Sequence, residues 1–228
     1  MRRATRGTPE VWDKLLADHG VATTFHGEAQ SPATYLAEGA REWEEYIRPH
    51  LTPGCDQVLE WGAGAGRITR HAARDCGALY AWEPAEGPRA LLLDVSNDLV
   101  GLCIHPGYQI VQTMTDELMD RLPDRCITDC FCYNVVHHMT YDDIYDMLVY
   151  VDRVLAIGGR LLFNFVTFDS DAAAELMSKK EGSFPAYVWH GEQIGGMVAD
   201  LVGGMSLEYE WIERDLGGRV FQLWERES

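Results

Sequence analysis

The stretch Glu60-Trp61-Gly62-Ala63-Gly64-Ala65-Gly66 decides the fold of this 228-residue chain. It follows the apolar pair Val58-Leu59 and precedes residues 67–73, a run typical of a helix. Because glycine has no Cβ, three alternating glycines allow a sharp turn between a strand and a helix. They also allow a ligand to approach the free amide groups at the N-terminus of that helix. The stretch therefore predicts a site for a nucleotide-like cofactor.

The spacing of these glycines excludes two common nucleotide-binding loops. A dinucleotide fingerprint requires Gly-x-Gly-x-x-Gly, but Arg67 stands where its last glycine should be. A P-loop requires a Lys and then a Ser or Thr after its last glycine, and no such pair follows Gly66. The pattern that remains is an acid at the end of a strand, followed by Gly-x-Gly-x-Gly.

A second acid stands at a distance from this loop that suits a nucleoside. Glu83 lies 21 residues after Gly62, at the end of the short apolar run 79–82. A carboxylate at the tip of the second strand of such a fold can accept hydrogen bonds from both ribose hydroxyls. The alternative is a surface carboxylate at the end of a strand, and the placement of Glu83 favours the ribose interpretation.

A third block lies between residues 126 and 166. Residues 126–133 have the length of a buried strand, and Asn134-Val135-Val136-His137-His138-Met139 follows them. Thr140 and Asp143 form a capping pair that predicts the start of a helix. Gly158-Gly159 then predicts the end of that helix, and residues 160–166 indicate another strand.

In their order and spacing, these blocks resemble the motifs of class I S-adenosylmethionine-dependent methyltransferases, over about residues 58–166. The resemblance implies an enzyme that uses S-adenosyl-L-methionine to methylate oxygen, nitrogen or carbon of a small-molecule acceptor. Two alternatives stay open. One is a protein methyltransferase, and the other is a non-catalytic protein of the same fold that binds the cofactor or serves as a scaffold.

The resemblance also assigns cofactor roles to individual residues. Glu60 would organise the glycine loop, the loop would hold the methionine and ribose portion, and Glu83 would bind the ribose hydroxyls. Residues 112–114 stand where the family often binds the adenine amino group; they lack the frequent acid, for which Asp116 is a substitute. The expected cofactor-binding residues are Glu60, Gly62, Ala63, Gly64, Gly66, Glu83, Pro84, Thr113, Met114 and Asn134.

His137 and His138 are the candidate catalytic residues. An imidazole titrates near neutral pH, so either histidine could take a proton from a hydroxyl or amine acceptor. The alternative is that the pair orders the loop or lines the pocket. Tyr35, Trp43 and Trp189 are the candidate substrate-binding residues, and the alternative for the first two is packing against the core.

The alternation of strand and helix patterns from residue 58 onward predicts an α/β fold. We expect a Rossmann-like three-layer sandwich, with a mostly parallel seven-stranded sheet and a C-terminal antiparallel hairpin. The expected strands are 57–61, 78–83, 108–112, 126–133 and 160–166, with a hairpin of 207–213 and 219–225. The expected helices are 9–19, 32–47, 66–75, 88–99, 115–121, 141–156 and 191–202.

We expect residues 1–228 to form a single methyltransferase domain. Residues 1–53 would form an N-terminal helical cap, and residues 54–166 the cofactor-binding core. Residues 167–190 would form an insertion on the substrate side, and residues 191–228 a terminal helix and hairpin.

The charge of the chain limits its partners. The sequence has 19 Lys and Arg against 36 Asp and Glu, a formal net charge of −17. Binding of nucleic acid requires clustered cations, which the sequence lacks, so we expect neither nucleic acid nor an anionic membrane as a partner. The sequence does not fix the oligomeric state.

Location and metal content follow from what the sequence lacks. No apolar run approaches the roughly 20 residues of a membrane span, and no apolar signal segment follows the basic N-terminus, so we expect a cytoplasmic protein. The six cysteines do not have the spacing of a zinc site, so we expect no metal and reduced thiols.

Overall fold

The computed structural model describes residues 9–26, 31–102, 110–167, 187–213 and 219–227. The chain divides into two compact units, residues 1–122 and 123–228. Each unit contains strands and helices. The expectation of a single domain over the whole chain stays a prediction.

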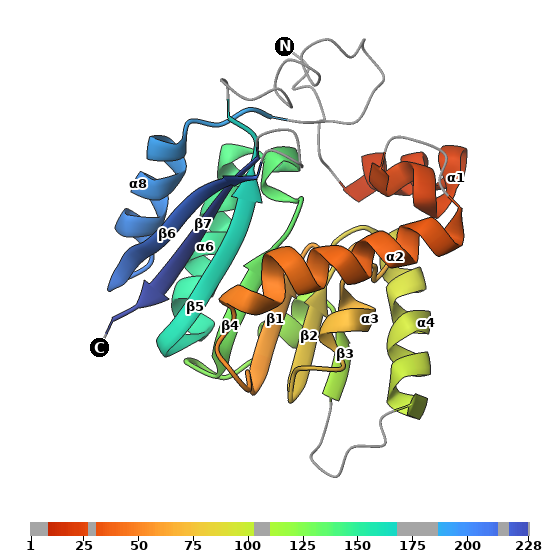
Figure 1. Cartoon of the computed structure of the whole chain (residues 1–228), viewed down its shortest axis with the longest axis horizontal. Coiled ribbons are helices and arrows are strands. Elements are labelled where there is room, and N and C mark those ends of the chain that lie inside the picture. Colours follow the sequence, from red (N-terminus) through yellow and green to blue (C-terminus); the bar gives the residue numbers. More distant parts are fainter. Residues whose placement is uncertain (1–8, 27–30, 103–109, 168–186, 214–218, 228) are drawn as a thin grey trace. The chain divides into compact units, whose positions relative to one another are not determined.

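The first unit carries three parallel strands in the order β3-β2-β1 (Figure 1). Leu59 pairs with Tyr80, and Trp82 pairs with Met114, so the strands end at the same edge of the sheet. The strands are β1 (Gln57–Trp61), β2 (Ala78–Trp82) and β3 (Ile110–Met114). The helices that follow them are α3 (Thr69–Ala72), α4 (Glu86–Leu102) and α5 (Asp116–Met119).

Two helices precede these strands, α1 (Pro9–His26) and α2 (Pro32–Glu42). The predicted start of α2 is confirmed: the Ser31 hydroxyl accepts the N–H of Thr34 at 3.1 Å, and Pro32 occupies the first turn. The predicted helical conformation up to residue 47 is confirmed, but only its first part is α-helical. The α-helix stops at Glu42 and continues as a π-helical turn (Trp43–Ile47) and a 3₁₀ turn (Arg48–His50).

The second unit carries four strands in the order β4-β5-β7-β6. β4 (Ile127–Cys132) and β5 (Leu155–Phe165) are parallel, whereas β7 (Arg219–Arg226) is antiparallel to both β5 and β6 (Met205–Glu213). Its described helices are a 3₁₀ turn η3 (Val136–His138), α6 (Tyr141–Val154) and α8 (Gly191–Leu201), and α6 contacts α8. The predicted α/β class and the C-terminal antiparallel hairpin are therefore confirmed.

The capping pair at the start of α6 is also confirmed. The Thr140 hydroxyl accepts the N–H of Asp143 at 3.2 Å, and the Asp143 carboxylate accepts the N–H of Thr140 at 2.7 Å. The end of this helix was placed too late, at residue 156. Helix α6 ends at Val154 and β5 begins at Leu155, because a shift in register against β4 and the left-handed Gly158 (φ +74°) accommodate residues 156–159 within the strand.

The boundaries of other elements also differ from the expected ones. The helix expected at 66–75 is only Thr69–Ala72, since its first residues belong to the turn that follows Gly66. The strand expected at 108–112 lies two residues later, and residues 168–186 of the expected substrate-side insertion lie outside the described residues. Among the helices of the described segments, none combines the length and the apolar character that crossing a bilayer requires.

Candidate functional site

The glycine loop adopts a backbone that other residues reach only with strain. Gly62, Gly64 and Gly66 have φ angles of +78°, +57° and +81°. A side chain in this left-handed region costs roughly 1–2 kcal/mol per residue, so the alternating glycines are a requirement of the turn. The carbonyl of Trp82 accepts the N–H groups of both Gly62 and Ala63 at 2.9 Å, which fixes the loop to the end of β2.

Glu83 points into this loop. Its Oε2 accepts the N–H of Gly64 at 2.9 Å, and its Oε1 accepts the N–H of Ala85 at 2.9 Å. The side chain is buried, and burial raises the pKa of Glu83 to about 7, although both N–H groups favour the ionised form. A carboxylate offers about four acceptor positions, so two remain for the hydroxyls of a ligand.

Glu60 is a buried residue of β1, one position before the strand ends. Its Oε2 accepts the hydroxyl hydrogen of Thr69 at 2.6 Å, which ties the strand to the start of α3. Burial raises the pKa of Glu60 to about 8, while the bond from Thr69 and the charge of Arg67 act in the opposite direction. The role of Glu60 in organising the loop stays a prediction.

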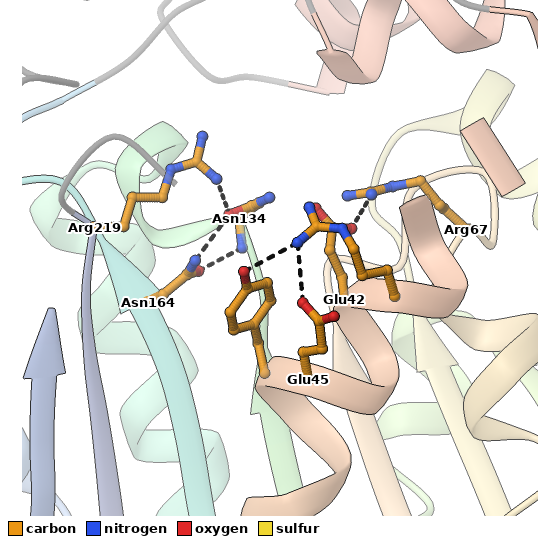
Figure 2. Close-up of polar contacts among 8 residues, drawn as sticks. Glu42, Glu45, Arg67, Asn134, Asn164 and Arg219 are labelled. Carbon is orange, nitrogen blue, oxygen red and sulfur yellow. Dashed lines mark hydrogen bonds and ion pairs between the residues drawn. The ribbon is translucent and has the colours of Figure 1, made fainter. Parts of the chain in front are cut away.

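Helix α2 is docked on the residue that follows the loop. The Arg67 guanidinium forms a buried ion pair with Glu42 (Figure 2) and lies 5.7 Å from the centre of the Tyr35 ring. A Cβ at Gly39 would lie 2.7 Å from the Arg67 carbonyl oxygen, so only glycine permits this close approach. Sequence analysis did not identify Glu42, Gly39 or Arg67, although a cation directly after the last glycine was a visible signal.

The two aromatic candidates of this region differ in their surroundings. Tyr35 lies beside Arg67 and the loop, and burial raises its pKa to about 12. Trp43 is only 1% exposed, and its indole N–H donates to Asp75 Oδ2 at 2.8 Å. Trp43 is therefore a packing residue, and we do not retain it among the residues proposed to contact a substrate.

The ends of β2 and β3 bring together the residues expected near adenine. Thr113 and Met114 pair with Ala81 and Trp82, and Met114 is buried. The Trp82 indole N–H donates to Asp116 Oδ1 at 3.0 Å, so Asp116 lies beside Trp82 at this edge. Pro84 follows Glu83 directly, and its carbonyl accepts the Arg89 guanidinium at 2.8 Å.

In the second unit, Asn134 follows β4 with an unusual backbone. Its φ is +60°, the left-handed region, and its N–H donates to Asn164 Oδ1 at 2.6 Å. Asn164 Nδ2 donates in return to Asn134 Oδ1 at 2.9 Å, and the Arg219 guanidinium donates to the same oxygen (Figure 2). Sequence analysis missed Asn164 and Arg219. The single polar residue inside the apolar strand 161–166 was the signal for Asn164.

His137 and His138 lie together in η3, with ring centres 4.0 Å apart. His137 is buried, and burial holds its pKa well below the usual range, with smaller contributions from His138 and the charge of Arg219. It is therefore neutral at pH 7. Its Nδ1 has no hydrogen-bond partner among the described residues, and its carbonyl accepts the N–H of Tyr187 at 2.5 Å.

Trp189 lies at the end of β5 in the same unit. Its N–H donates to the Val166 carbonyl at 2.9 Å, and its ring centre is 6.2 Å from that of Tyr187. Because Tyr187 also bonds the His137 carbonyl, this segment connects Trp189 to the histidine turn. Within the ranges that the structure describes, no three His, Cys, Asp or Glu side chains gather in a way that could hold a metal ion.

Comparison with known families gives a match over the central part of the chain. Residues 59–163 match the family model described as "Methyltransferase domain", and this segment runs from β1 to β5. Comparison with curated protein sequences gave no significant match.

Solved structures resemble the chain in fold at low sequence identity. Magnesium protoporphyrin IX methyltransferase from Synechocystis, with bound S-adenosylmethionine, has a TM-score of 0.63 at 13% identity, covering 100% of both chains. A Thermotoga maritima protein described as a possible histamine N-methyltransferase has a TM-score of 0.64 at 16% identity, covering 96% of this chain and 100% of its own. Geranyl diphosphate C-methyltransferase from Streptomyces coelicolor has a TM-score of 0.60 at 14% identity, covering 90% and 88%.

The glycine loop, the acid at the tip of β2 and the order of the strands all lie within the segment that the methyltransferase model matches. Beyond that segment, the chain resembles the compared solved structures in fold. Residues 59–163, a little under half of the chain, thus match a methyltransferase domain, and the solved structures of similar fold include a methyltransferase with bound S-adenosylmethionine.

Proposed function

We propose that this chain transfers the methyl group of S-adenosyl-L-methionine to oxygen, nitrogen or carbon of a small-molecule acceptor. The observation that carries the proposal is the position of Glu83, whose carboxylate is buried against the Gly64 amide inside a loop of three left-handed glycines. A buried carboxylate needs partners, and the two acceptor positions left on Glu83 match the two hydroxyls of a ribose.

The residues of the first unit fit this cofactor. Gly62, Gly64 and Gly66 keep side chains away from the turn, so a ligand can approach the backbone there. Trp82 and Pro84 flank Glu83 and offer apolar surface for an adenine, while Asp116 lies against the Trp82 indole. When bound, S-adenosyl-L-methionine supplies a methyl group that its positively charged sulfur already activates.

The protein then has to hold the acceptor in line and close, and to exclude water. Positioning of this kind can contribute roughly 7–11 kcal/mol to a displacement reaction. We propose that Asn134, His137, His138 and Trp189 of the second unit face the acceptor. His137 is neutral at pH 7 and can take a proton there, but its low pKa makes it a weak base, so the half-exposed His138 is the better candidate for a general base.

Two features support a small acceptor. The proteins of similar fold are named for magnesium protoporphyrin IX, geranyl diphosphate and, as a possible substrate, histamine. The net charge of −17 disfavours nucleic acid as the substrate. The protein methyltransferase and the scaffold protein are the alternatives, and the cytoplasmic location stays a prediction from the sequence.

Calorimetric titration with S-adenosylmethionine and with S-adenosylhomocysteine tests the proposal. We expect both ligands to bind, and we expect turnover of S-adenosylmethionine with at least one member of a broad panel of metabolites. Binding of neither ligand would contradict the proposal. Binding without turnover on the whole panel, or turnover only on protein substrates, would instead favour one of the two alternatives.

A further inference from the structure

Resting on the proposed function, we infer that the atom that is methylated is an oxygen. The reason is that the Asn134 side chain can donate hydrogen bonds to the substrate but cannot accept one from it. Asn134 lies two residues after Cys132, the last residue of β4. In sheets of parallel strands with helices, ligands bind beyond the carboxyl ends of the strands. The orientation of the Asn134 amide therefore bears on the chemistry of the group that is methylated.

Three hydrogen bonds fix this orientation. The backbone N–H of Asn134 can only donate, so the atom of Asn164 that it meets at 2.6 Å is the oxygen Oδ1. The other end of the Asn164 amide is then the donor Nδ2, and the atom of Asn134 that it meets at 2.9 Å must be Oδ1. The Arg219 guanidinium, which has only donors, reaches the same Oδ1.

The side-chain oxygen of Asn134 therefore accepts hydrogen bonds from within the protein. An amide oxygen has two lone pairs, and Asn164 and Arg219 take both (Figure 2). The Nδ2 group carries two N–H donors, and none of the three bonds of this cluster uses them. Asn164 is fully buried, and the left-handed backbone of Asn134 is held by the same bonds, so the arrangement is rigid.

A donor at this place suits an oxygen nucleophile. A hydroxyl, phenolate or carboxylate oxygen has more than one lone pair, so one can accept an N–H from Asn134 while another attacks. A neutral amine nitrogen has a single lone pair, which an N–H donor would occupy when it is needed for the attack. An amine or ammonium would bind more favourably to a hydrogen-bond acceptor. The Asn134 oxygen cannot take that role, because Asn164 and Arg219 already donate to it.

The charges around Asn134 point the same way. The Arg219 cation lies against the Asn134 oxygen and also acts on His137. A positive charge stabilises an oxyanion and destabilises an ammonium ion. In the transfer, the oxygen forms a bond to the methyl carbon while the carbon–sulfur bond breaks and its electron pair stays on sulfur. The proton of a hydroxyl acceptor leaves to a histidine nitrogen or to water, and a carboxylate or phenolate has none to lose.

A binding experiment on the protein saturated with S-adenosylhomocysteine tests this inference. Phenol and benzoate are matched in size to aniline and benzylamine, and each is titrated calorimetrically. We expect the oxygen ligands to bind at least about 10-fold more tightly than the amines, the effect of a charge-assisted hydrogen bond. Amines that bind as tightly as their oxygen counterparts, or oxygen ligands that fail to bind at all, would overturn it.

Variants separate the donor role from a structural one. Asn134→Asp keeps an oxygen for Asn164 and Arg219 but turns the outward donor into an acceptor, so the preference should shift toward the amines. Asn134→Gly keeps the left-handed backbone and should abolish the preference without reversing it. An Asn134→Asp protein that melts like the native one and keeps its preference for oxygen would overturn the inference.

Arg219→Gln and Arg160→Gln form a matched pair of charge removals. Arg160 lies on β5 and pairs with Glu225, so its replacement should leave ligand preference unchanged, whereas Arg219→Gln should weaken the oxygen ligands about 10-fold. If the two replacements change the affinity for the oxygen ligands equally, the proposed role of the Arg219 charge is contradicted. Because S-adenosylhomocysteine binding is measured first, loss of that binding contradicts the proposed function itself, while intact binding with amine preference contradicts only the choice of oxygen.

Discussion

Glu83 is a buried carboxylate whose two oxygens are each held by one backbone N–H, from Gly64 and from Ala85. Its pKa of about 7 means that it is only partly ionised at neutral pH in the ligand-free protein. Ribose hydroxyls donate hydrogen bonds and therefore favour the ionised carboxylate. The cofactor affinity is thus coupled to the protonation of one side chain.

From this coupling we expect the affinity for S-adenosylhomocysteine to rise as the pH increases through about 7, the pKa of Glu83, and to level off once Glu83 is fully ionised. In Glu83→Gln the rise should disappear, and the affinity at pH 8 should be about 10- to 100-fold lower, as expected for hydrogen bonds to a charged group. Calorimetric titrations across this range measure both effects. A native affinity that is flat in pH would contradict this role of Glu83.

The raised pKa of Glu60 predicts how the stability of the protein depends on pH. Its pKa is raised to about 8 by burial, above the ordinary value of 4.5, so the folded state binds this proton more tightly than the unfolded state. The corresponding stability is present below pH 4.5 and is lost as the pH rises toward 8. Glu60→Gln, which can still accept the Thr69 hydroxyl, should flatten the fall in the free energy of unfolding between pH 5 and 8, on the order of a few kcal/mol. Denaturant titrations at several pH values check this, and parallel curves for the two proteins would refute it.

Much at the residue scale could be foreseen. The approach of Glu83 to the glycine loop followed from sequence because neighbouring parallel strands end at one edge. The Glu42–Arg67 ion pair and the Asn134–Asn164–Arg219 cluster could not be foreseen, since they join side chains 25 to 85 residues apart whose orientation depends on packing. The two acid positions were predictable, but their raised pKa values depend on burial, which no spacing in the sequence reveals.

At the scale of elements, the proposed cofactor binding by the glycine loop depends on the backbone conformation of that loop. Gly64→Ala should therefore cost about 1–2 kcal/mol of stability and also weaken cofactor binding. Gly54→Ala is the matched control, since Gly54 has φ +73°, open space around its Cβ position, and a place before β1 away from the loop. We expect a similar loss of stability there with unchanged affinity for S-adenosylhomocysteine. Equal affinities of the two variants would show that the loop does not hold the cofactor.

Helix α2 is the second element that bears on the loop. A methyl group at Gly39 would meet the Arg67 backbone at 2.7 Å, a contact that flexible side-chain motion cannot relieve. Gly39→Ala should lower stability by about 1–3 kcal/mol, as overpacking does, and weaken cofactor binding by displacing the loop. The exposed Ala37→Ser on the same helix is the control and should change neither. Thermal melting and calorimetry measure the two effects, and an unaffected affinity would separate α2 from the loop.

Elements were predicted better than their ends. The Ser31 and Thr140 caps were read correctly because the cap residues act locally on the next backbone groups. The π-helical form of residues 43–47, the end of α6 and the limits of α3 were not, because a π-helical turn, a shifted register and a left-handed loop depend on tertiary packing.

At the scale of the whole molecule, ligand binding to the first unit should raise the stability of whatever unfolds with it. At 100 times its dissociation constant, S-adenosylhomocysteine adds about 2.7 kcal/mol, which corresponds to a rise in Tm of roughly 5–10 °C for a chain of this size. If residues 1–228 are one domain, scanning calorimetry should show a single transition that shifts as a whole. Two transitions, of which one alone shifts, would contradict the single-domain prediction.

The methyltransferase domain match and the fold concern the cofactor, whereas the proposed acceptor depends on a few side chains of the second unit. The small-molecule acceptor and the oxygen atom are therefore open to separate tests, and neither affects the assignment of the cofactor. The assignment of the cofactor site itself depends on Glu83 and the glycine loop acting on the same ligand.

A crystal structure of the complex with S-adenosylhomocysteine tests that claim most directly. We predict that the Glu83 carboxylate accepts hydrogen bonds from both ribose hydroxyls, at about 2.5–3.0 Å, while the ligand follows the backbone of Gly62 to Gly66. A ribose bound away from Glu83, or a ligand that leaves the glycine loop untouched, would contradict the account.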